Sequence, residues 1–278
     1  MKNEILSVKN VTYEYQPGHP ALDQISLSIG RGEKIAVMGS NGAGKSTFFL
    51  NLNGVLHPQK GEIYYQGKQV GKKDVKELRR RVGFVFQDAD NQMIAATVEA
   101  EIAFGPMNLK LPREEVKERV EQALDYMDLQ KYRKRPPHYL SGGEKKRVSI
   151  ADIIAMKSEV ILFDEPTAAL DPLSADMLEK VLADLYREGK TLLISTHDVD
   201  FAYRWADRIV VFDQGKILAD GGVREVFLQQ RLLEQAHLKK PVLLAVYEIL
   251  QRQGVIRAGS YPRTVDELAE NMGGTIDE

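Results

Sequence analysis

Residues 39–47 form the stretch of this chain whose residue types and spacing point most directly to chemistry. The stretch follows an apolar run and precedes a helix-like run, and its glycines let successive backbone N–H groups turn inward toward phosphate oxygens. The residues expected to surround the phosphates are Gly39, Ser40, Asn41, Gly42, Ala43, Gly44, Lys45, Ser46 and Thr47. Lys45 is placed to reach the β- and γ-phosphates, and the Ser46 hydroxyl is placed to bind Mg²⁺. We therefore predict a nucleoside triphosphate site here, and not a turn without a ligand.

Two carboxylates follow a second apolar run, at residues 160–163. A continuous apolar run of this length is typical of a strand that is buried on both faces of a parallel sheet. Asp164 is expected to hold Mg²⁺, directly or through water, and Glu165 to orient and deprotonate the attacking water. Because buried paired acids need a cation, a purely structural role for the pair is hard to maintain.

His197 follows the next apolar strand, and Asp171 follows the loop that comes after Glu165. His197 ends the apolar strand at 190–195. A lone histidine is usually structural, but ligands bind at the carboxyl ends of strands in such sheets, which favours a contact with the γ-phosphate. Asp171 precedes Pro172 in the arrangement of a helix N-cap, and it can be that cap and nothing more.

Gln87 and Tyr15 each have a functional and a structural interpretation that the residues leave open. Gln87 ends the apolar run at 82–86, so it either contacts Mg²⁺ or the attacking water, or it is an ordinary polar cap. Tyr15 shares one face of its strand with Tyr13, because side chains repeat every two residues. An aromatic ring there can stack on an adenine base or can simply fill the surface of the sheet.

Residues 140–156 begin with a motif that also has two interpretations. Ser141 and Glu144 have the spacing of a capping box, which by itself only starts a helix. Gly142 and Gly143 lie in the first turn, where each is less favourable than alanine by roughly 0.5–1 kcal/mol. Bare N–H groups at a helix start let a phosphate approach, so the motif can serve a γ-phosphate from its far side. Local geometry leaves open whether that phosphate is bound by this chain or by another.

The rest of the pattern predicts the elements that position these side chains. Short strands are expected at 5–8, 11–15, 25–29, 61–65, 209–212 and 217–219. Between about 88 and 139 the pattern becomes helical, with helices at 97–104 and 113–127, which indicates a helical subdomain inserted between two strands. A helix through about Glu188 follows Pro172. From about Arg224 the chain is helical again, and this tail is expected to be a dimerisation or regulatory piece.

Composition excludes several classes of protein and site. The 38 Lys and Arg residues nearly balance the 40 Asp and Glu residues, so a nucleic-acid partner held by a broad basic surface is not expected. The chain has no cysteine, which excludes disulfides and thiolate metal sites, and its scattered histidines predict no structural metal site. Residues 1–10 lack the apolar core of a signal peptide, and no run approaches a membrane-spanning length.

Together the motifs occur in the order of the ATP-binding cassette (ABC) ATPases, which the chain resembles over roughly residues 4–228. Leu140 to Glu144 is the signature that separates that family from other P-loop proteins. The resemblance implies an α/β P-loop NTPase fold with a mixed sheet core, an antiparallel β subdomain and an inserted helical subdomain at about 88–157. Residues 1–228 would be the ATP-binding domain, and residues 229–278 a small C-terminal helical extension.

The same resemblance implies ATP and Mg²⁺ as ligands and a head-to-tail dimer with a second, identical or different, ATPase subunit. ATP would be sandwiched between the phosphate loop of one subunit and the Ser141 helix of the other. Tyr15 would be the adenine-stacking aromatic residue, Asp171 would report across the dimer, and His197 would be the switch histidine.

A narrower resemblance, to the energy-coupling factor (ECF) importers, is carried by residues 86–92, 103–109 and 141–147. Residues 196–207 and the tail are similar to the cobalt/nickel branch of those importers. The resemblance implies a peripheral protein on the cytoplasmic side of the cell membrane, working with an integral membrane coupling subunit and a substrate-binding membrane protein. Residues 98–101 depart from the pattern, because many members have more consecutive acids there, and this departure concerns the coupling interface.

Three other functions are alternatives to the import of cobalt or nickel. Vitamin-importing relatives share most of these motifs. A non-transport ABC protein of DNA repair or translation would need coiled-coil insertions, two cassettes or a basic surface, which the sequence lacks. A regulatory module that binds ATP without hydrolysis is disfavoured by the complete set of Asp164, Glu165 and His197.

Overall fold

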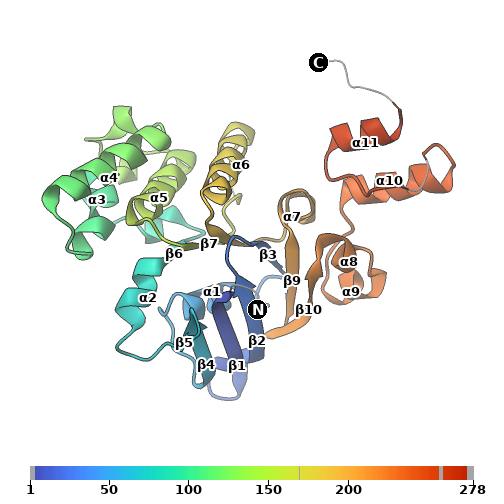
Figure 1. Cartoon of the computed structure of the whole chain (residues 1–278), viewed down its shortest axis with the longest axis horizontal. Helices are drawn as coiled ribbons and strands as arrows, with labels where there is room; N and C mark the ends of the chain where they lie inside the picture. Colours follow the sequence, from blue (N-terminus) through green and yellow to red (C-terminus); the bar gives the residue numbers. More distant parts are fainter. Residues whose placement is uncertain (1–3, 169, 257–258, 274–278) are drawn as a thin grey trace.

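The computed structural model describes residues 4–168, 170–256 and 259–273 of the chain. Its centre is a six-stranded sheet with the order β10-β9-β3-β8-β7-β6 (Figure 1). Neighbouring strands from β9 to β6 are parallel, and β10 pairs with β9 in the antiparallel sense, so the sheet is mixed, as predicted. The strands are β3 (Lys34–Met38), β6 (Val82–Val85), β7 (Val160–Asp164), β8 (Thr191–Ser195), β9 (Arg208–Asp213) and β10 (Lys216–Gly222).

A second, antiparallel sheet has the order β2-β1-β4-β5 and lies below the first in Figure 1. Its strands are β1 (Glu4–Gln16), β2 (His19–Gly30), β4 (Lys60–Tyr65) and β5 (Lys68–Gln69). The strands predicted at 5–8 and 11–15 are one strand with an irregular middle. The register with β2 shifts between Val8 and Val11, and Asn10 has a φ of 51° there. Such a bulge breaks the period of two, so the sequence pattern divides a strand that the backbone keeps whole.

Helices cover the six-stranded sheet on both faces, because alternate residues of its buried strands point to opposite sides. Ile35 and Leu162 pack toward helix α1 (Lys45–Leu52) and the antiparallel sheet. Ala36 and Phe163 pack on the other side toward helices α5 (Gly142–Met156), α6 (Pro172–Arg187) and α7 (Val199–Trp205). Both faces are therefore apolar, and polar side chains of the buried strands gather at the strand ends.

Helices α3 (Val98–Asn108), α4 (Arg113–Tyr126) and α5 lie together at one side of the sheet, upper left in Figure 1. Helix α2 (Val75–Arg81) precedes β6. The apolar stripe predicted on α4 is buried, and it contains Val116, Val120, Ala123 and Leu124. The segment between β6 and β7 therefore forms a helical subdomain, as predicted from its change of pattern.

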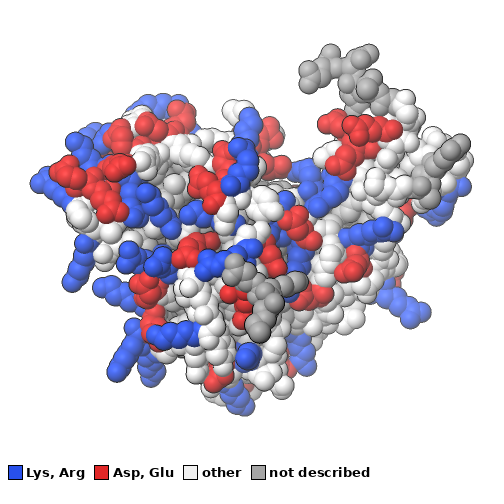
Figure 2. All heavy atoms as spheres, in the orientation of Figure 1, with Lys and Arg blue, Asp and Glu red and all other residues white. Residues whose placement is uncertain are grey.

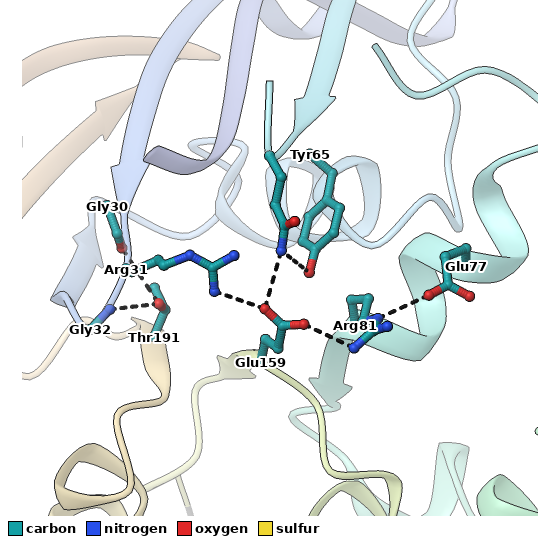
Figure 3. Close-up of polar contacts among 9 residues, drawn as sticks. Gly30, Arg31, Gly32, Tyr65, Glu77, Arg81, Glu159 and Thr191 are labelled. Carbon is teal, nitrogen blue, oxygen red and sulfur yellow. Dashed lines mark hydrogen bonds and ion pairs between the residues drawn. The ribbon is translucent and has the colours of Figure 1, made fainter. Parts of the chain in front are cut away.

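Glu159 connects the two sheets at the start of β7. Its carboxylate accepts hydrogen bonds from Arg31 and from Arg81, at 2.8 and 2.9 Å (Figure 3). Burial disfavours the charged form of Glu159, but the contacts with Arg31, Tyr65 and Arg81 outweigh it, and they hold the pKa of Glu159 below its usual value. The ionised carboxylate thereby links the end of β2 and the start of β6 to the central sheet.

The C-terminal part of the chain lies at the opposite side of the molecule from α3 and α4 (Figure 1). It contains α8 (Val223–Phe227), α9 (Gln230–Gln235), α10 (Val242–Arg252) and α11 (Val265–Asn271), with a small apolar cluster of Tyr247, Ile256 and Leu268. Tyr203 of α7 donates a hydrogen bond to the Pro262 carbonyl at 2.9 Å, and Arg263 donates to the Tyr203 carbonyl at 2.8 Å. These contacts attach the tail to the core through α7.

Among the described residues, none of the helices has both the length and the apolar character that crossing a bilayer requires. On the face drawn in Figure 2, lysine and arginine side chains are interspersed with aspartate and glutamate side chains.

Candidate nucleotide-binding site

The loop between β3 and α1 has a backbone that only glycine accommodates at its first position. Gly39 has a φ of +144°, and a Cβ atom placed on it would lie 2.2 Å from the Phe212 carbonyl oxygen. Gly44 has a φ of +108°, and its Cβ would lie 2.5 Å from the Ala21 carbonyl oxygen. Both glycines therefore allow the loop to pass close to neighbouring backbone and to present its N–H groups at the start of α1.

Lys45 extends along the inside of this loop. Its ammonium group donates hydrogen bonds to the carbonyl oxygens of Gly39 and Ser40, at 2.8 and 3.2 Å. The same nitrogen lies 3.7 Å from Oε1 of Glu165, and both side chains are more than nine-tenths buried. The ammonium group is thus held between the loop and the carboxylate, at the place where the terminal phosphate is predicted.

Ser46 is exposed beside the loop, and Thr47 is buried in it. The Thr47 hydroxyl lies 3.2 Å from the hydroxyl of Tyr15. The Tyr15 ring remains 61% exposed, and its edge-to-face contact with Tyr13 has a centroid separation of 5.0 Å. Tyr15 therefore does not fill the interior of its sheet but stands next to the phosphate loop, where an exposed ring can stack on a base.

The two predicted acids lie at the end of β7 and have different partners. Asp164 accepts a hydrogen bond from the Ser195 hydroxyl, and the backbone N–H of Glu165 donates to the same hydroxyl oxygen at 3.0 Å. Oε2 of Glu165 lies 2.9 Å from Nδ1 of His197. The other oxygen of Glu165 is buried and has no hydrogen-bond partner among the described residues.

Glu165 is also strained, with a φ of 42° in the left-handed region. Non-glycine residues seldom adopt this conformation, and strain of roughly 1–3 kcal/mol persists only where the surroundings enforce it. The hydrogen bonds to Ser195 provide that enforcement. The His197 side chain is 67% exposed, so the contact with Glu165 reaches the surface of the site.

Gln87, Asp164 and Gly142 line a common groove of about 680 Å³. Gln87 is exposed at the mouth of the groove, while Asp164 is buried in its wall. The groove thus brings together the predicted Mg²⁺ ligands of two neighbouring strand ends and the start of α5.

Ser141 forms the predicted capping box. Its hydroxyl accepts from the Glu144 N–H at 3.3 Å, and its own N–H donates to the Glu144 carboxylate at 2.8 Å. A Cβ on Gly143 would lie 2.7 Å from the Ser174 hydroxyl, so this glycine permits α5 to approach α6. Asp171 caps α6 by accepting from the Ser174 N–H at 3.0 Å.

The start of α5 is separate from the phosphate loop. Ser141 and Gly142 are exposed, and a Cβ on Gly142 would meet no atom within 4 Å. Among the described residues, no hydrogen bond or ion pair joins residues 141–143 to residues 39–47. The two predicted phosphate-binding stretches therefore do not meet in a single polar network of this chain.

Comparisons with known proteins agree with this geometry. Residues 22–168 match the family model described as ABC transporter. A relative from Methanospirillum hungatei, the energy-coupling factor transporter ATP-binding protein EcfA2, is 47% identical over 95% of this chain and 67% of its own length. The energy-coupling factor transporter ATP-binding protein EcfA of Methanocaldococcus jannaschii is 43% identical over 99% of both chains. The chain belongs to the ABC transporter ATP-binding subunits of the energy-coupling factor type.

A solved structure supports the same assignment for the fold of this ABC ATPase. The structure is that of CbiO1 from Clostridium perfringens, described as part of the ABC transporter complex CbiONQ. It has a TM-score of 0.75 and 36% sequence identity, and the match covers 91% of this chain and 96% of that one. The predicted ABC ATPase fold is therefore confirmed.

The side chains of this ABC ATPase fit a nucleotide with Mg²⁺. The Asp164 carboxylate, the Ser46 hydroxyl and the Gln87 carboxamide are oxygen groups of the kind that Mg²⁺ prefers, and Gln87 and Asp164 line one groove, while Ser46 is not among its lining residues. Oε1 of Glu165 is buried and accepts no hydrogen bond among the described residues, and its nearest charged group is the Lys45 ammonium, at 3.7 Å. These residues come from three strand ends and one helix start of the ATPase.

Two residues at the site of this ABC ATPase were not predicted from the sequence. Ser195 holds both Asp164 and Glu165, and the general preference for polar residues at strand ends could have identified it. Lys146 is buried in α5 and donates hydrogen bonds to the Phe86 and Gln87 carbonyl oxygens, both at 2.8 Å. No sequence pattern distinguishes Lys146 from its neighbour Lys145, because only the packing of α5 decides which of the two is buried.

Proposed function

We propose that this ATPase forms a head-to-tail dimer and powers an energy-coupling factor importer for cobalt or nickel ions. The transport role is supported by the names of the relatives, which are ATP-binding proteins of energy-coupling factor transporters. The metal-ion substrate is supported by the motifs at 196–207 and by the tail, which resemble the cobalt/nickel branch. An importer of vitamins is the alternative, and the ATPase itself would not contact either cargo.

The observation that carries the proposal is the position of Glu165 between Lys45 and His197. Its Oε1 lies 3.7 Å from the Lys45 ammonium group and accepts no hydrogen bond among the described residues, and its Oε2 lies 2.9 Å from Nδ1 of His197. On binding ATP, the Lys45 ammonium exchanges its loop carbonyls for the β- and γ-phosphates. Oε1 of Glu165 then accepts a proton from the attacking water, and His197 contacts the γ-phosphate from the open side. Ser46, Gln87 and Asp164 would hold Mg²⁺, which would neutralise part of the phosphate charge when bound.

The dimer follows from what one chain leaves incomplete. Phosphoryl transfer depends mainly on positioning and on charge stabilisation around the γ-phosphate. The loop of one subunit would cover only one side of that group. The exposed start of α5, with Ser141, Gly142 and Gly143, would close the other side in a second subunit, and Asp171 would lie next to that interface. Tyr15 would stack on the adenine.

Residues 1–228 are assigned to the ATP-binding domain, with the helical subdomain at about 88–157 inserted in it. Residues 229–278 are assigned to a dimerisation or regulatory extension, of which 257–258 and 274–278 lie outside the described residues. The dimer would act on the cytoplasmic side of the cell membrane. Its partners would be an integral coupling subunit and a separate substrate-binding membrane protein, and no nucleic acid.

Affinity purification of the tagged chain from membranes tests the partners. The expected result is recovery of integral membrane proteins of the coupling and substrate-binding kinds. Metal uptake in cells with and without the genes of those partners then distinguishes cobalt or nickel from a vitamin as cargo. Recovery of nucleic acid in place of membrane proteins would overturn the transport role.

The substitution Glu165→Gln tests the catalytic role. Glutamine has nearly the same shape but cannot accept the proton from water, so turnover should fall by roughly 10²-fold or more. ATP binding should be retained, because the loop and Lys45 are unchanged. Phosphate release with Mg²⁺ and equilibrium nucleotide binding measure the two quantities. Hydrolysis at the wild-type rate would remove Glu165 from the mechanism.

A further inference from the structure

Helix α5 holds the segment that follows β6 along one of its sides. Near its start, the ammonium group of Lys145 lies 2.6 Å from Oδ1 of Asp90. Further along, the Gln92 carboxamide donates to the Ser149 carbonyl oxygen at 3.3 Å. The segment from 86 to 92 is therefore held against the part of α5 between Lys145 and Ser149.

Among these contacts between α5 and residues 86–92, those of Lys146 involve Gln87. Its ammonium group donates to the carbonyl oxygens of both Phe86 and Gln87, at 2.8 Å each. The residue is 4% exposed, which is unusual for lysine. A buried ammonium group is unfavourable unless hydrogen bonds and nearby negative charge compensate it, and here two carbonyl dipoles and the field of Asp164 do so. Burial lowers the pKa of Lys146 to about 8, while Asp164 and Asp88 act against that shift.

The two adjacent lysines differ in how strongly they can hold the segment. The Asp90 partner of Lys145 is 61% exposed, and ion pairs with exposed groups contribute about 0–1 kcal/mol. The Lys146 hydrogen bonds are charge-assisted and start from a buried ammonium group, and removing that group leaves two partly buried carbonyl groups without this donor. The direction of the Gln87 backbone therefore depends on Lys146 and not on Lys145.

We propose that Lys146 is a positioning residue, which fixes the Gln87 backbone to α5 so that Gln87 and the Ser141 end of that helix move as one unit. The proposal rests on the proposed function for its claim that Gln87 meets the bound nucleotide. In a dimer, the start of α5 faces the nucleotide of the partner site. A shift of α5 on closure would then carry Gln87 with it toward the nucleotide of its own site, which links the two sites through a single side chain.

The substitution Lys146→Met tests this role, because methionine keeps much of the side-chain volume and removes the donors. Lys145→Met is the matched control, one residue earlier on the same helix. Hydrogen–deuterium exchange without nucleotide should become faster by about tenfold or more at residues 86–92 in the Lys146 variant only. This readout does not require hydrolysis, so it separates the positioning role from the proposed function.

Steady-state kinetics give the second readout. Because a misplaced group lowers the rate of the chemical step, kcat should fall roughly tenfold in Lys146→Met while KM for ATP changes less than about twofold. Lys146→Gln keeps an uncharged NH₂ donor group on a shorter side chain. Its exchange rate at 86–92 and its kcat should both lie between those of the wild type and those of Lys146→Met. If Lys146→Met does not fold, Lys146→Gln becomes the test variant, and its thermal unfolding shows whether its fold is intact. Unchanged exchange at 86–92 in the folded variant, or equal effects in Lys145→Met, would overturn the proposal.

Discussion

At the scale of single residues, the site depends on backbone conformations that few side chains tolerate. Gly39 combines a positive φ with a close approach to the Phe212 carbonyl oxygen, and Glu165 has a positive φ although it is not a glycine. The first is a steric requirement of the loop. The second occurs at the residue whose carboxylate oxygens face His197 on one side and the Lys45 ammonium group on the other.

We expect Gly39→Ala to weaken nucleotide binding strongly. A methyl group 2.2 Å from the Phe212 carbonyl oxygen must displace either the loop or β9, and the φ of +144° is strained for alanine. ATP affinity should fall more than about tenfold, together with a lower Tm, since such strain costs roughly 1–3 kcal/mol. Isothermal titration and thermal unfolding measure the two effects.

Gly18→Ala is the matched control, because Gly18 also has a positive φ, of +82°, but a Cβ there would meet no atom within 4 Å. It should lower Tm slightly and leave ATP affinity unchanged. Equal losses of affinity in both variants would show that the close approach to Phe212 is not what the loop requires.

Some of these residues could be predicted from the sequence, and others could not. Lys45 and the loop glycines were predictable, because their chemistry depends on their neighbours in the sequence. The contact of Glu165 with His197 joins the ends of two strands, and the topology rule for α/β sheets anticipates only that they meet at one edge. The burial of Lys146 was not predictable, because it depends on how α5 packs against residues 60 positions earlier in the chain.

At the scale of elements, the interface of α3 and α5 contains a buried acidic pair. The Asp152 carboxylate on α5 accepts from the Gln92 carboxamide at 3.2 Å, and Glu101 on α3 is 3% exposed and accepts from the Ala95 N–H at 2.6 Å. Burial, with the Glu101 carboxylate adding to it, raises the pKa of Asp152 from 3.8 to about 7, while the Gln92 contact acts in the opposite direction. Asp152 is therefore protonated in the folded chain over a range in which it is ionised in the unfolded chain.

This difference predicts how the free energy of unfolding changes with pH. Between about pH 4 and pH 7 the unfolded chain loses the Asp152 proton and the folded chain keeps it, so this group lowers stability as pH rises. Asp152→Asn removes the effect. The variant should gain stability relative to the wild type from pH 4.5 to 7.5, by on the order of a few kcal/mol.

Urea unfolding at several pH values measures that gain. Asp176→Asn, which removes a carboxylate from an exposed position of α6, is the control and should show little change. A constant difference between Asp152→Asn and the wild type across the range would mean that the Asp152 carboxyl group is not protonated in the folded protein.

Elements were predictable where one pattern covers the whole of them. The buried strands β7 and β8 follow from continuous apolar runs, and the apolar stripe of α4 follows from helical periodicity. Strand β1 was divided in two, because its bulge at Asn10 interrupts the alternation while the backbone pairing continues. The pairing order of the strands depends on contacts that no local pattern contains.

At the scale of the whole molecule, the proposed dimer would make the phosphate loop of one subunit and the start of α5 of the other the two halves of one site. Gly142 is open to solvent, so a larger side chain there leaves the fold of the subunit intact and disturbs only what docks on it. Lys45 is buried at the other half. The two positions therefore allow each half of the composite site to be removed separately.

Mixing two inactive variants tests the head-to-tail arrangement. Lys45→Ala removes the loop ammonium, and Gly142→Glu places bulk and negative charge where the partner's γ-phosphate would lie. Either variant alone should have no competent site. In a mixed dimer with opposed orientation, the intact Lys45 of one subunit meets the intact Gly142 of the other, and one of the two sites is restored. Random mixing should therefore recover up to about a quarter of the wild-type rate of phosphate release.

The amount recovered distinguishes the possible assemblies. Gly142→Ala, which adds one methyl group in open space, should stay close to the wild-type rate and shows that the loss in Gly142→Glu comes from bulk and charge. If each chain completed its own site, the mixture would release phosphate no faster than the average of its two components. Because Lys45 and Gly142 would then act within one subunit, no combination of the two variants could restore the site, and the head-to-tail dimer would have to be abandoned.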